Sequence, residues 1–227
     1  MFPVVILCGG YAKRMSPLTD TIPKSLIDIN GKPFLYHQLE WLTLQGVQEI
    51  HLCTGHYGNQ IAASIAEYNS THEHIPFIYM WPDGPTPIGT AEALRRVPMI
   101  RSTPFFVLYG DVFALTPLYI VQHKFEAYEP YALMVIYESW LYNKQANVDY
   151  YPPRIVKYNK FNQEPQMIHG DYGLSILTQQ ALAASASTDL ADVFAALNNE
   201  MIGFPVTGKP YEIGSFSGLA RTREFLQ

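Results

Sequence analysis

Short apolar runs alternate with segments of helical spacing along the first 140 residues, and this alternation restricts the fold more than any other feature. Runs with the length and composition of buried strands lie at residues 3–8, 49–54, 76–80, 104–109 and 131–137. Helical spacing of apolar residues lies between them, at 33–46, 57–68, 89–97 and 116–127. Strands that alternate with helices predict a parallel sheet, and strands that are apolar at nearly every position predict helices on both of its faces. The first half of the chain is therefore predicted to be Rossmann-like and doubly wound.

Beyond residue 140 the pattern becomes irregular, with prolines, amides and tyrosines around short strand-like pieces. The expected strands here are 153–159, 172–177 and 201–206, and the expected helices are 178–185, 188–199 and 217–226. Open α/β sheets bind ligands beyond the carboxyl ends of their strands. The loops after residues 8, 80, 109 and 160 are therefore the places where chemistry is expected.

The composition of the chain limits the classes of protein to which it can belong. A chain of 227 residues, 48% of them hydrophobic, has enough apolar material for one soluble domain spanning 1–227. The net charge of -5 has the wrong sign for a protein that wraps nucleic acid, so an anionic ligand must be met by locally placed cations. Cys8 and Cys53 lie in strand-like runs and are expected to be reduced core thiols. With neither a signal peptide nor an apolar stretch of ~20 residues in the sequence, a cytoplasmic, unanchored protein is expected.

The loop after the first predicted strand has features of a phosphate-binding loop. Leu7 and Cys8 are followed by Gly9 and Gly10, where the chain must turn sharply and where backbone amides can approach a ligand. The loop lacks the GxxxxGK[ST] and GxGxxG patterns, and two glycines alone are equally typical of a plain tight turn. Arg14 and Lys24 follow on the same stretch, and together they favour a clamp for a polyphosphate.

The sequence resembles the sugar-1-phosphate nucleotidyltransferases. The resemblance is carried by segments that occur in order from residue 4 to about 226: LCGGYAKRMSPLT, IPKSLIDINGKPFLYHQLEWLTLQGV, PIGTAEAL, YGDVF, VKYNK, DYGLSIL and YEIGS. It implies the nucleotide-diphospho-sugar transferase fold, a Rossmann-like three-layer α/β/α arrangement with a mixed, mostly parallel central sheet. It further implies a nucleotide-binding half at 1–112 and a sugar-phosphate-binding half at 113–227.

The resemblance assigns nucleotide-binding roles to the first loop and to a later glycine motif. It implies that Arg14 and Lys24 are catalytic groups that hold the phosphates of the nucleotide. The backbone around the base and phosphates is implied to come from Leu7, Gly9, Gly10, Lys13, Gly89 and Thr90. The sequence departs from the family pattern at two positions, with Ala12 where glycine is usual and Lys13 where threonine is usual. Lys13 either adds a phosphate contact or is merely solvated, and Gly89 and Thr90 also suit a plain helix cap.

Two acids are implied to bind Mg²⁺. Asp111 ends a strongly apolar strand, where an acid is expected to be paired or bound to metal, and the family uses this aspartate as a metal ligand. Glu212 stands where the family usually has the second aspartate, and its carboxylate is an equally hard ligand with one more methylene of reach. Alternatively, Glu212 caps the helix that starts near Ser217 or pairs with Arg221.

The motifs leave the nucleobase open and assign residues to the sugar phosphate and the sugar. Some relatives place an acid or amide just before the glycine motif, but Pro85 and Thr86 stand there, which leaves the base open. Lys160 falls where relatives carry a catalytic lysine that meets the sugar phosphate, while Lys157 is expected to be a solvated charge on a strand edge. The motifs imply sugar contacts from Gly110, Asp171 and Gly173.

The implied activity is transfer of a nucleotidyl group from an NTP to a sugar 1-phosphate, with release of pyrophosphate. The short members that the chain resembles are heptose-1-phosphate and mannose-1-phosphate guanylyltransferases and N-acetylmuramate-1-phosphate uridylyltransferases. They favour GDP-heptose or GDP-hexose for capsule or lipopolysaccharide synthesis. A uridylyl- or cytidylyltransferase for another phosphorylated small molecule, or a catalytically silent regulatory subunit, stays open. The expected partners are the NTP and the sugar phosphate, without nucleic acid or membrane, and a homo-oligomer is left open.

Overall fold

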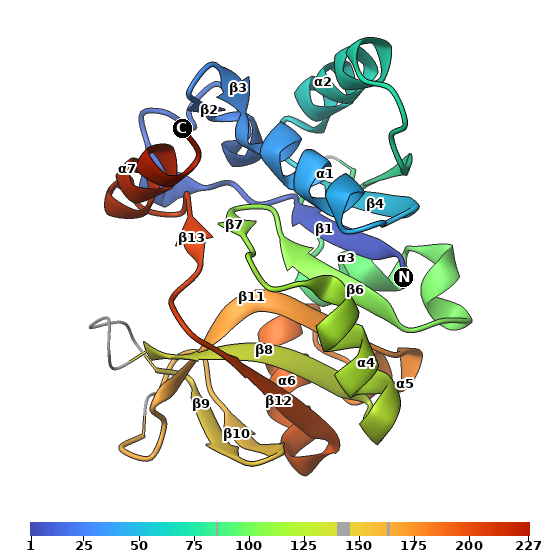
Figure 1. Cartoon of the computed structure of the whole chain (residues 1–227), viewed down its shortest axis with the longest axis vertical. Coiled ribbons are helices and arrows are strands. Elements are labelled where there is room, and N and C mark those ends of the chain that lie inside the picture. The colour runs from blue at the N-terminus through green and yellow to red at the C-terminus, as the bar shows by residue number, and fades with distance from the viewer. Residues whose placement is uncertain (85, 140–145, 163) are drawn as a thin grey trace.

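A central nine-stranded sheet organises the computed structural model, which describes residues 1–227 except 85, 140–145 and 163 (Figure 1). Its strands, in spatial order, are β5 (Phe77–Pro82), β4 (Glu49–Thr54), β1 (Val4–Cys8), β6 (Phe105–Tyr109), β11 (His169–Leu177), β8 (Ala132–Glu138), β12 (Met201–Val206), β10 (Arg154–Tyr158) and β9 (Val148–Tyr151). Two small antiparallel pairs stand apart, β2 (Asp28–Ile29) with β3 (Lys32–Pro33), and β7 (Val112–Phe113) with β13 (Tyr211–Glu212).

The directions of the strands divide the sheet. From β5 through β4 and β1 to β6 every pairing is parallel, whereas β11 lies antiparallel between β6 and β8. The pairing of β12 with β8 is again parallel, and β10 runs against both β12 and β9. Only β11 and β10 of these nine described strands therefore run against the rest. The predicted mixed, mostly parallel sheet is confirmed in this sense.

Helices pack on both faces of the sheet. One apolar core receives α1 (Phe34–Leu44), α2 (Gly58–Thr71) and α4 (Leu118–Tyr128), and the other receives α3 (Thr90–Arg95), α5 (Gln179–Ala183) and α6 (Leu190–Leu197). Side chains of β1 alternate between these cores because successive residues of a strand point to opposite faces. Val4 and Ile6 enter the first core and Val5 enters the second, so the near-continuous apolar run of this strand is buried on both faces of the sheet.

A third, smaller core joins the two ends of the chain. Met15, Ile29 and Phe34 pack there with Ile213 and Leu219, which belong to the last segment and to α7 (Phe216–Phe225). The guanidinium of Arg223 donates to the carbonyl of Asp28 at 3.0 Å. Figure 1 shows α7, in red, beside the blue strands β2 and β3. Residues near the first loop and residues near the C-terminus are thereby fixed against each other.

The predicted elements match the structure closely within the apolar part of the sequence. Each predicted strand and helix is present, with ends that mostly differ by one to three residues. The prediction missed β9, the first residues of β11 from His169, and the two-residue strands β2, β3, β7 and β13. The missed pieces carry polar or aromatic residues and lack the apolar run by which strands were recognised. Part of the irregular region, residues 140–145 and 163, lies outside the described residues.

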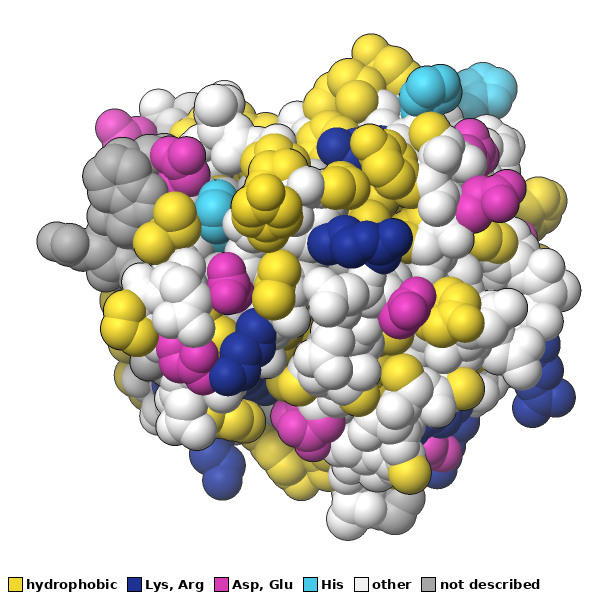
Figure 2. Space-filling view, turned by 90° about the horizontal axis from the view of Figure 1, so that it is seen from below, with side chains coloured by type: hydrophobic (Ala, Val, Ile, Leu, Met, Phe, Trp, Pro, Cys, Tyr) yellow, Lys and Arg dark blue, Asp and Glu magenta, His cyan; other side chains and the backbone are white. Residues whose placement is uncertain are grey.

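The surface carries charges of both signs. On the face seen in Figure 2, basic and acidic side chains are interspersed with apolar ones rather than gathered by sign. Among the described residues, no helix combines the length and the apolar character needed to cross a membrane.

Removing a large side chain from the core under α6 should destabilise the fold. Phe194 is 1% exposed, and its ring packs edge-on against Tyr158 at a centroid distance of 5.4 Å. We expect Phe194→Ala to lower the free energy of unfolding by about 3–5 kcal/mol, because the lost apolar contacts leave a cavity. Phe161→Ala, at a ring that is 71% exposed, is the matched control and should change it by less than about 0.5 kcal/mol. Urea unfolding curves of both variants measure the difference, and equal losses would contradict the assignment of this core.

Candidate active site

Two adjoining cavities open at the carboxyl edge of the parallel strands. The first cavity, of about 220 Å³, is lined by Leu7, Cys8, Gly9, Gly10, Lys24, Ser25, Cys53, Asp83, Pro87, Gly89, Thr90, Ala93, Tyr109, Gly110 and Asp111. The second cavity, of about 490 Å³, is lined by Arg14, Thr90, Tyr109, Asp111, Val112, Tyr137, Asn147, Tyr158, Lys160, Asp171, Tyr172, Gly173, Asp189, Lys209, Pro210, Glu212, Gly214, Ser215 and Arg221. Thr90, Tyr109 and Asp111 line both cavities, so the two spaces meet at these side chains.

The first loop has the tight backbone that its glycines predicted. A Cβ atom on Gly55 would lie 2.6 Å from the carbonyl oxygen of Gly9, so the loops after β4 and β1 approach as closely as glycine alone permits. Ala12 adopts a left-handed conformation with φ of 51°, where the family usually has glycine. Its carbonyl accepts hydrogen bonds from the hydroxyl of Thr19 and the backbone N–H of Met15. These bonds hold the loop in the glycine-like shape despite the alanine.

The two cations beside this loop have different positions. Arg14 lines the second cavity, with one guanidinium nitrogen 3.8 Å from where a Cβ of Gly214 would lie. Lys13 is not among the described residues that line either cavity, and its ammonium lies 5.7 Å from the ring centre of Tyr11. The geometry therefore favours the solvated alternative for Lys13 and leaves Arg14 as the cation of the loop that faces the site.

An ion pair joins the first loop to the turn after β6. The ammonium of Lys24 donates to Oδ2 of Asp111 at 2.6 Å, and both side chains are largely buried. Pro23, with φ of -67°, precedes the short 3₁₀ turn that carries Lys24. The side-chain amide of Gln38 fixes the turn from below by donating to the carbonyls of Tyr109 at 3.1 Å and Val112 at 2.7 Å. The sequence prediction missed Gln38, although a glutamine on the apolar face of the helix at 33–46 was the available signal.

Asp111 and Glu212 converge beside Gly214. A Cβ on Gly214 would lie 2.9 Å from Oδ2 of Asp111 and 3.1 Å from Oε2 of Glu212, so these two oxygens are at most 6.0 Å apart. Two hard carboxylates with a nearby glycine fit a small divalent cation, which commonly takes one or two protein carboxylates and completes its shell with substrate phosphates and water. Among the described residues, no group of three or more His, Cys, Asp and Glu side chains is placed to hold a metal without such help.

Glu212 also has the capping role that the sequence left open. Its carboxylate accepts the backbone N–H of Gly214 and the hydroxyl of Ser215, both at 2.6 Å. Ser215 is the N-cap of α7 and accepts the N–H of Gly218 at 3.0 Å. The two readings are therefore compatible, because one carboxylate holds the start of α7 and still faces Asp111. Arg221 donates to the carbonyl of Pro210 and stacks over the ring of Tyr211.

The glycine motif before α3 is tied to α6. Gly89 has φ of 94°, and a Cβ there would lie 2.5 Å from the carbonyl oxygen of Thr188. The hydroxyl of Thr90 accepts the N–H of Leu190 at 2.8 Å, so it caps α6 rather than its own helix. Lys160 lies 3.4 Å from Asp189, the N-cap of α6, and lines the second cavity. Thr90, predicted for the nucleotide, and Lys160, predicted for the sugar phosphate, therefore both contact the N-terminus of α6.

The residues predicted for the sugar are divided between the cavities. Asp171 and Gly173 line the second cavity, whereas Gly110 lines the first, together with the residues predicted for the nucleotide. A carboxylate oxygen of Asp171 accepts the N–H of Gly173 at 2.8 Å, and the hydroxyl of Tyr109 donates to the other oxygen at 3.3 Å. Burial raises the pKa of the Asp171 carboxyl to about 6, while the hydrogen bonds from Gly173 and Tyr109 and the charge of Lys160 act in the opposite direction.

The structure adds residues that the sequence prediction did not include. Asp83 lines the first cavity, although Pro85 and Thr86 stand directly before the glycine motif in the sequence; Pro85 lies outside the described residues. In the second cavity, Lys209 and Arg221 join the predicted Arg14 and Lys160. Lys209 lies in the loop before β13 and Arg221 lies on α7, and neither belongs to a motif that the sequence shows. Lys157, in contrast, pairs with Glu164 at the surface and is exposed as expected, although its strand β10 lies between β12 and β9 rather than at the edge of the sheet.

Comparison with known proteins places the chain in a family. Residues 4–200 match the MobA-like NTP transferase domain. The chain belongs to this family. It is 36% identical over 112 residues to the mannose-1-phosphate guanyltransferase of Yarrowia lipolytica, and the aligned stretch covers 48% of this chain and 30% of that relative. The chain thus matches about a third of the length of that curated relative.

Solved structures show the same fold over the whole MobA-like chain. HddC from Yersinia pseudotuberculosis, complexed with GMP-PN, has a TM-score of 0.76 at 20% identity and covers 100% of both chains. A UDP-glucose pyrophosphorylase complexed with UDP-glucose has a TM-score of 0.82 at 18% identity and covers 100% of this chain and 98% of its own. The resemblance recognised in the sequence is therefore confirmed at the level of family and fold.

The raised pKa of Asp171 gives the stability of the fold a distinctive pH dependence. The folded state takes up this proton near pH 6, whereas the unfolded chain does so near 3.8. Burial of the ionised carboxylate therefore costs stability above about pH 6, and the cost disappears as the pH falls below 4. We expect Asp171→Asn to raise the free energy of unfolding by about 3 kcal/mol at pH 8 and by about 0.5 kcal/mol or less at pH 4, because the amide cannot ionise. Urea midpoints between pH 4 and 8 measure this.

The exposed Asp20 supplies the control, since Asp20→Asn removes a solvated carboxylate and should follow the pH course of the unmodified protein. An effect of Asp171→Asn that is the same at every pH would contradict the assigned ionisation.

Proposed function

We propose that this protein transfers a nucleotidyl group from an NTP to a sugar 1-phosphate, giving an NDP-sugar and pyrophosphate. The observation that carries the proposal is the position of Asp111, which is paired with Lys24 and lies where the two cavities meet. A transfer between two phosphorylated substrates needs two binding spaces that join at the reacting phosphorus. The first cavity would hold the nucleotide and the second the sugar phosphate.

The proposed halves of the chain agree with this division. Every described residue that lines the first cavity lies within 1–112, the proposed nucleotide-binding half. The residues that line the second cavity lie within 113–227, the proposed sugar-phosphate-binding half, apart from Arg14, Thr90, Tyr109, Asp111 and Val112. These exceptions come from the first loop, the glycine motif and the turn after β6. We describe the arrangement as the three-layer α/β/α form of a nucleotide-diphospho-sugar transferase, supported by the helices on both faces of the sheet.

The residues supply electrostatics rather than a covalent intermediate. A phosphate oxygen of the sugar phosphate attacks the α-phosphorus of the NTP, and the bond to the bridging oxygen breaks as pyrophosphate leaves. The attacking phosphate is already anionic near pH 7, so the protein needs no general base. Arg14 and Lys24 offset the charge of the triphosphate, and Lys160 orients the incoming phosphate. Asp111 and Glu212 would hold Mg²⁺, which offsets developing negative charge on the phosphoryl oxygens when bound.

The proposed backbone contacts come from the glycine loops. Leu7, Gly9, Gly10, Gly89 and Thr90 all line the first cavity, where their backbone would contact the nucleotide. Asp171 and Gly173 would meet sugar hydroxyls, because a carboxylate accepts from hydroxyl groups. The position of Gly110 in the first cavity supports a nucleotide contact there instead of the sugar contact expected from its motif.

The nucleobase and the sugar of the substrates are proposed from the names of the relatives. The aligned relative is a mannose-1-phosphate guanyltransferase, and HddC was solved with GMP-PN. These names support guanylyl transfer to a hexose 1-phosphate. The heptose alternative and a role in capsule or lipopolysaccharide synthesis are proposed from the sequence resemblance alone. The free, buried thiols of Cys8 and Cys53 support a reducing, cytoplasmic setting.

A matrix of substrates tests the activity. Each of the four NTPs is combined with mannose, glucose, heptose and N-acetylmuramate 1-phosphates, and metal-dependent release of pyrophosphate is measured. Product from GTP with a hexose or heptose phosphate is the expected result. Product from another pairing keeps the reaction class and changes the named substrates. Nucleotide binding without product in any pairing would favour a catalytically silent regulatory subunit of the same fold.

Removal of the carboxylate charge at Asp111 should abolish most of the turnover. We expect Asp111→Asn to lower kcat on the order of a hundredfold or more, because Lys24 loses its partner and the proposed cation loses a ligand. Asp149→Asn, on strand β9 and outside both cavities as described, is the control and should retain turnover. Pyrophosphate release measures both variants, and near-normal turnover in Asp111→Asn would show the metal assignment to be wrong.

Lys160 and Lys157 are close in sequence, but only Lys160 should affect catalysis. Lys160 lines the second cavity, whereas Lys157 pairs with Glu164 at the surface. We expect Lys160→Met to raise the KM for the sugar phosphate tenfold or more with a smaller effect on the KM for the NTP, since a lost charge-assisted contact costs about 1.5–3 kcal/mol. Lys157→Met should leave both constants within about twofold. Steady-state kinetics with each substrate varied in turn measure the split; equal effects of the two variants would contradict the role given to Lys160.

A further inference from the structure

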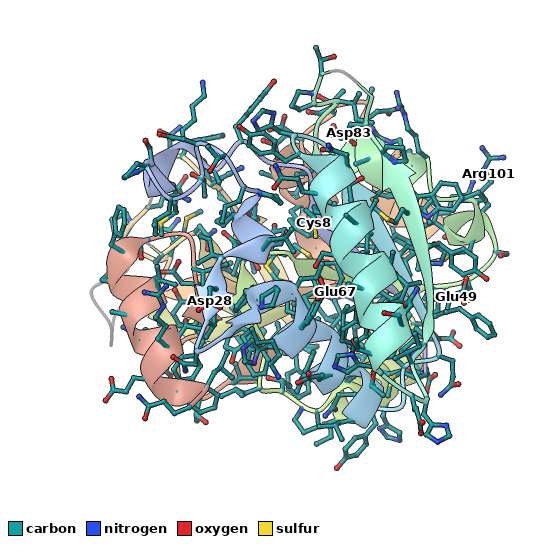
Figure 3. All side chains as sticks on the ribbon, turned by 90° about the horizontal axis from the view of Figure 1, so that it is seen from above. Cys8, Asp28, Glu49, Glu67, Asp83 and Arg101 are labelled. Carbon is teal, nitrogen blue, oxygen red and sulfur yellow. The ribbon has the colours of Figure 1, made fainter. Side chains whose placement is uncertain are left out.

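A single amide lies on the otherwise apolar face that α1 turns toward the sheet. Gln38 is 0% exposed. The other buried residues of this helix are apolar or aromatic, namely Phe34, Leu35, Tyr36, Leu39 and Leu42. Figure 3 looks onto the side of the molecule on which α1 and α2 lie, and it labels Cys8, the last residue of β1, near the middle of that view. The amide of Gln38 lies between α1 and the end of β6, where the turn that carries Asp111 begins.

The amide of Gln38 holds this turn on both sides of Asp111. Its Nε2 donates to the carbonyl of Tyr109 at 3.1 Å, before Asp111 in the chain, and to the carbonyl of Val112 at 2.7 Å, directly after it. The carbonyl of Asp111 itself accepts the backbone N–H of Ile213 at 2.9 Å. Three carbonyls of the turn are therefore bound by two segments that are distant in sequence. The backbone of Asp111 is thereby fixed between α1 and the last part of the chain.

The same amide has an oxygen without a partner. Among the described residues, none donates a hydrogen bond to Oε1 of Gln38, although this atom is buried. A buried acceptor without a partner costs stability, and a methionine of similar size would not carry that acceptor. The two donated hydrogen bonds therefore come with a penalty that an apolar residue would not incur. Conflicts of this kind between local packing and the residue present are expected near functional sites.

We infer that Gln38 is a positioning residue for the proposed transfer: through two carbonyls it sets the place of Asp111 relative to Glu212, and with it the affinity of this carboxylate pair for a divalent cation. The inference rests on the proposed function, because it takes Asp111 and Glu212 as the ligands of the cation. Gln38 is not among the described residues that line either cavity, so it acts through Asp111 rather than on a substrate. Mg²⁺ demands near-ideal geometry from its ligands, and groups that orient a ligand therefore affect binding strongly.

The variant Gln38→Met tests this through the effect of metal on nucleotide binding. Methionine fills a similar volume without a donor, so the carbonyls of Tyr109 and Val112 lose their partner. The Kd of the full chain for GTP, or for whichever NTP gives product in the substrate matrix, is measured by calorimetry with and without Mn²⁺ and without a sugar phosphate. Mn²⁺ should tighten this binding in the unmodified protein. We expect Gln38→Met to reduce the tightening about tenfold, while the Kd without metal stays within about twofold.

Turnover should follow the metal effect. We expect kcat for pyrophosphate release to fall about 10- to 100-fold in Gln38→Met, because a misplaced ligand weakens the electrostatic support of the reacting phosphate. Gln38→Glu gives a second variant that does not depend on the first one folding. A protonated glutamate keeps one donor for the two carbonyls, whereas the ionised form has none. The kcat of Gln38→Glu relative to that of the unmodified protein should therefore rise as the pH is lowered from about 9 to about 6.

A core variant separates misplacement of Asp111 from loss of stability. Ile61 on α2 is 0% exposed in the same core, and Ile61→Val destabilises the fold without removing a contact to the turn. Thermal midpoints report how far each variant is destabilised. Ile61→Val should keep kcat and the effect of Mn²⁺ within about twofold of the unmodified protein.

The results distinguish this inference from the proposed function. A Gln38→Met variant that keeps both kcat and the effect of Mn²⁺ would overturn the role of Gln38 while leaving nucleotidyl transfer in place. Equal losses in Gln38→Met and Ile61→Val, or a Kd without metal that rises as far as the Kd with metal, would overturn it as well, because they indicate general loosening. Failure of the unmodified protein to bind any NTP would overturn the proposed function, and this inference with it.

Discussion

The contact between the loop after β1 and the turn after β6 governs the geometry of the site. Gly110 donates its backbone N–H to the carbonyl of Leu7 at 3.0 Å, and a Cβ at position 110 would lie 2.7 Å from that same oxygen. The two strand ends therefore pack backbone against backbone. The ion pair between Lys24 and Asp111 adds a second connection between the same two segments. Because Asp111 lines both cavities, a shift of this turn would change the shape of both together. Gln38 restrains the turn from the helical layer beneath it.

This arrangement explains how an acidic protein can present cations to the two polyanions of the proposed reaction. The net charge is -5, yet Arg14, Lys160, Lys209 and Arg221 face one cavity together. Acids lie among them, so the charges are balanced before any substrate arrives. Asp189 illustrates the principle, since it caps α6 through the N–H of Ala191 and also faces Lys160 at 3.4 Å. Such an acid orients the cation without a full buried pair, and in the proposed reaction an entering phosphate would replace part of its interaction rather than meet a bare charge.

The sequence predicted the elements that bury apolar surface and missed those that depend on distant partners. Strands such as β1 and β6 carry five consecutive apolar or aromatic residues, and this local signal is sufficient. The pairing of β7 with β13 joins residues 112–113 to residues 211–212, and two residues on each side leave no periodic pattern. The candidate site shows the same difference. Asp111 follows a strand and was predicted, whereas the direction of Asp83 depends on Gly9 and Gly55 lacking side chains, which only the folded arrangement reveals.

Glu212 shows how a departure from the family pattern becomes coupled to distant residues. The side chain is one methylene longer than aspartate and bends back to the start of α7, where it holds Gly214 and Ser215. A Cβ at Gly218 would overlap the carboxylate oxygen Oε1, and a Cβ at Gly214 would meet Oε2, so both glycines leave room for the longer acid. Since α7 packs through Leu219 on the small core that contains Met15, the position of this second carboxylate is set by contact between the two ends of the chain. Shortening Glu212 would therefore loosen the start of α7 as well as change the distance to Asp111. Both glycines would still be needed, because a Cβ at Gly214 would lie 2.9 Å from Oδ2 of Asp111 and a Cβ at Gly218 would lie 2.6 Å from the backbone oxygen of residue 212.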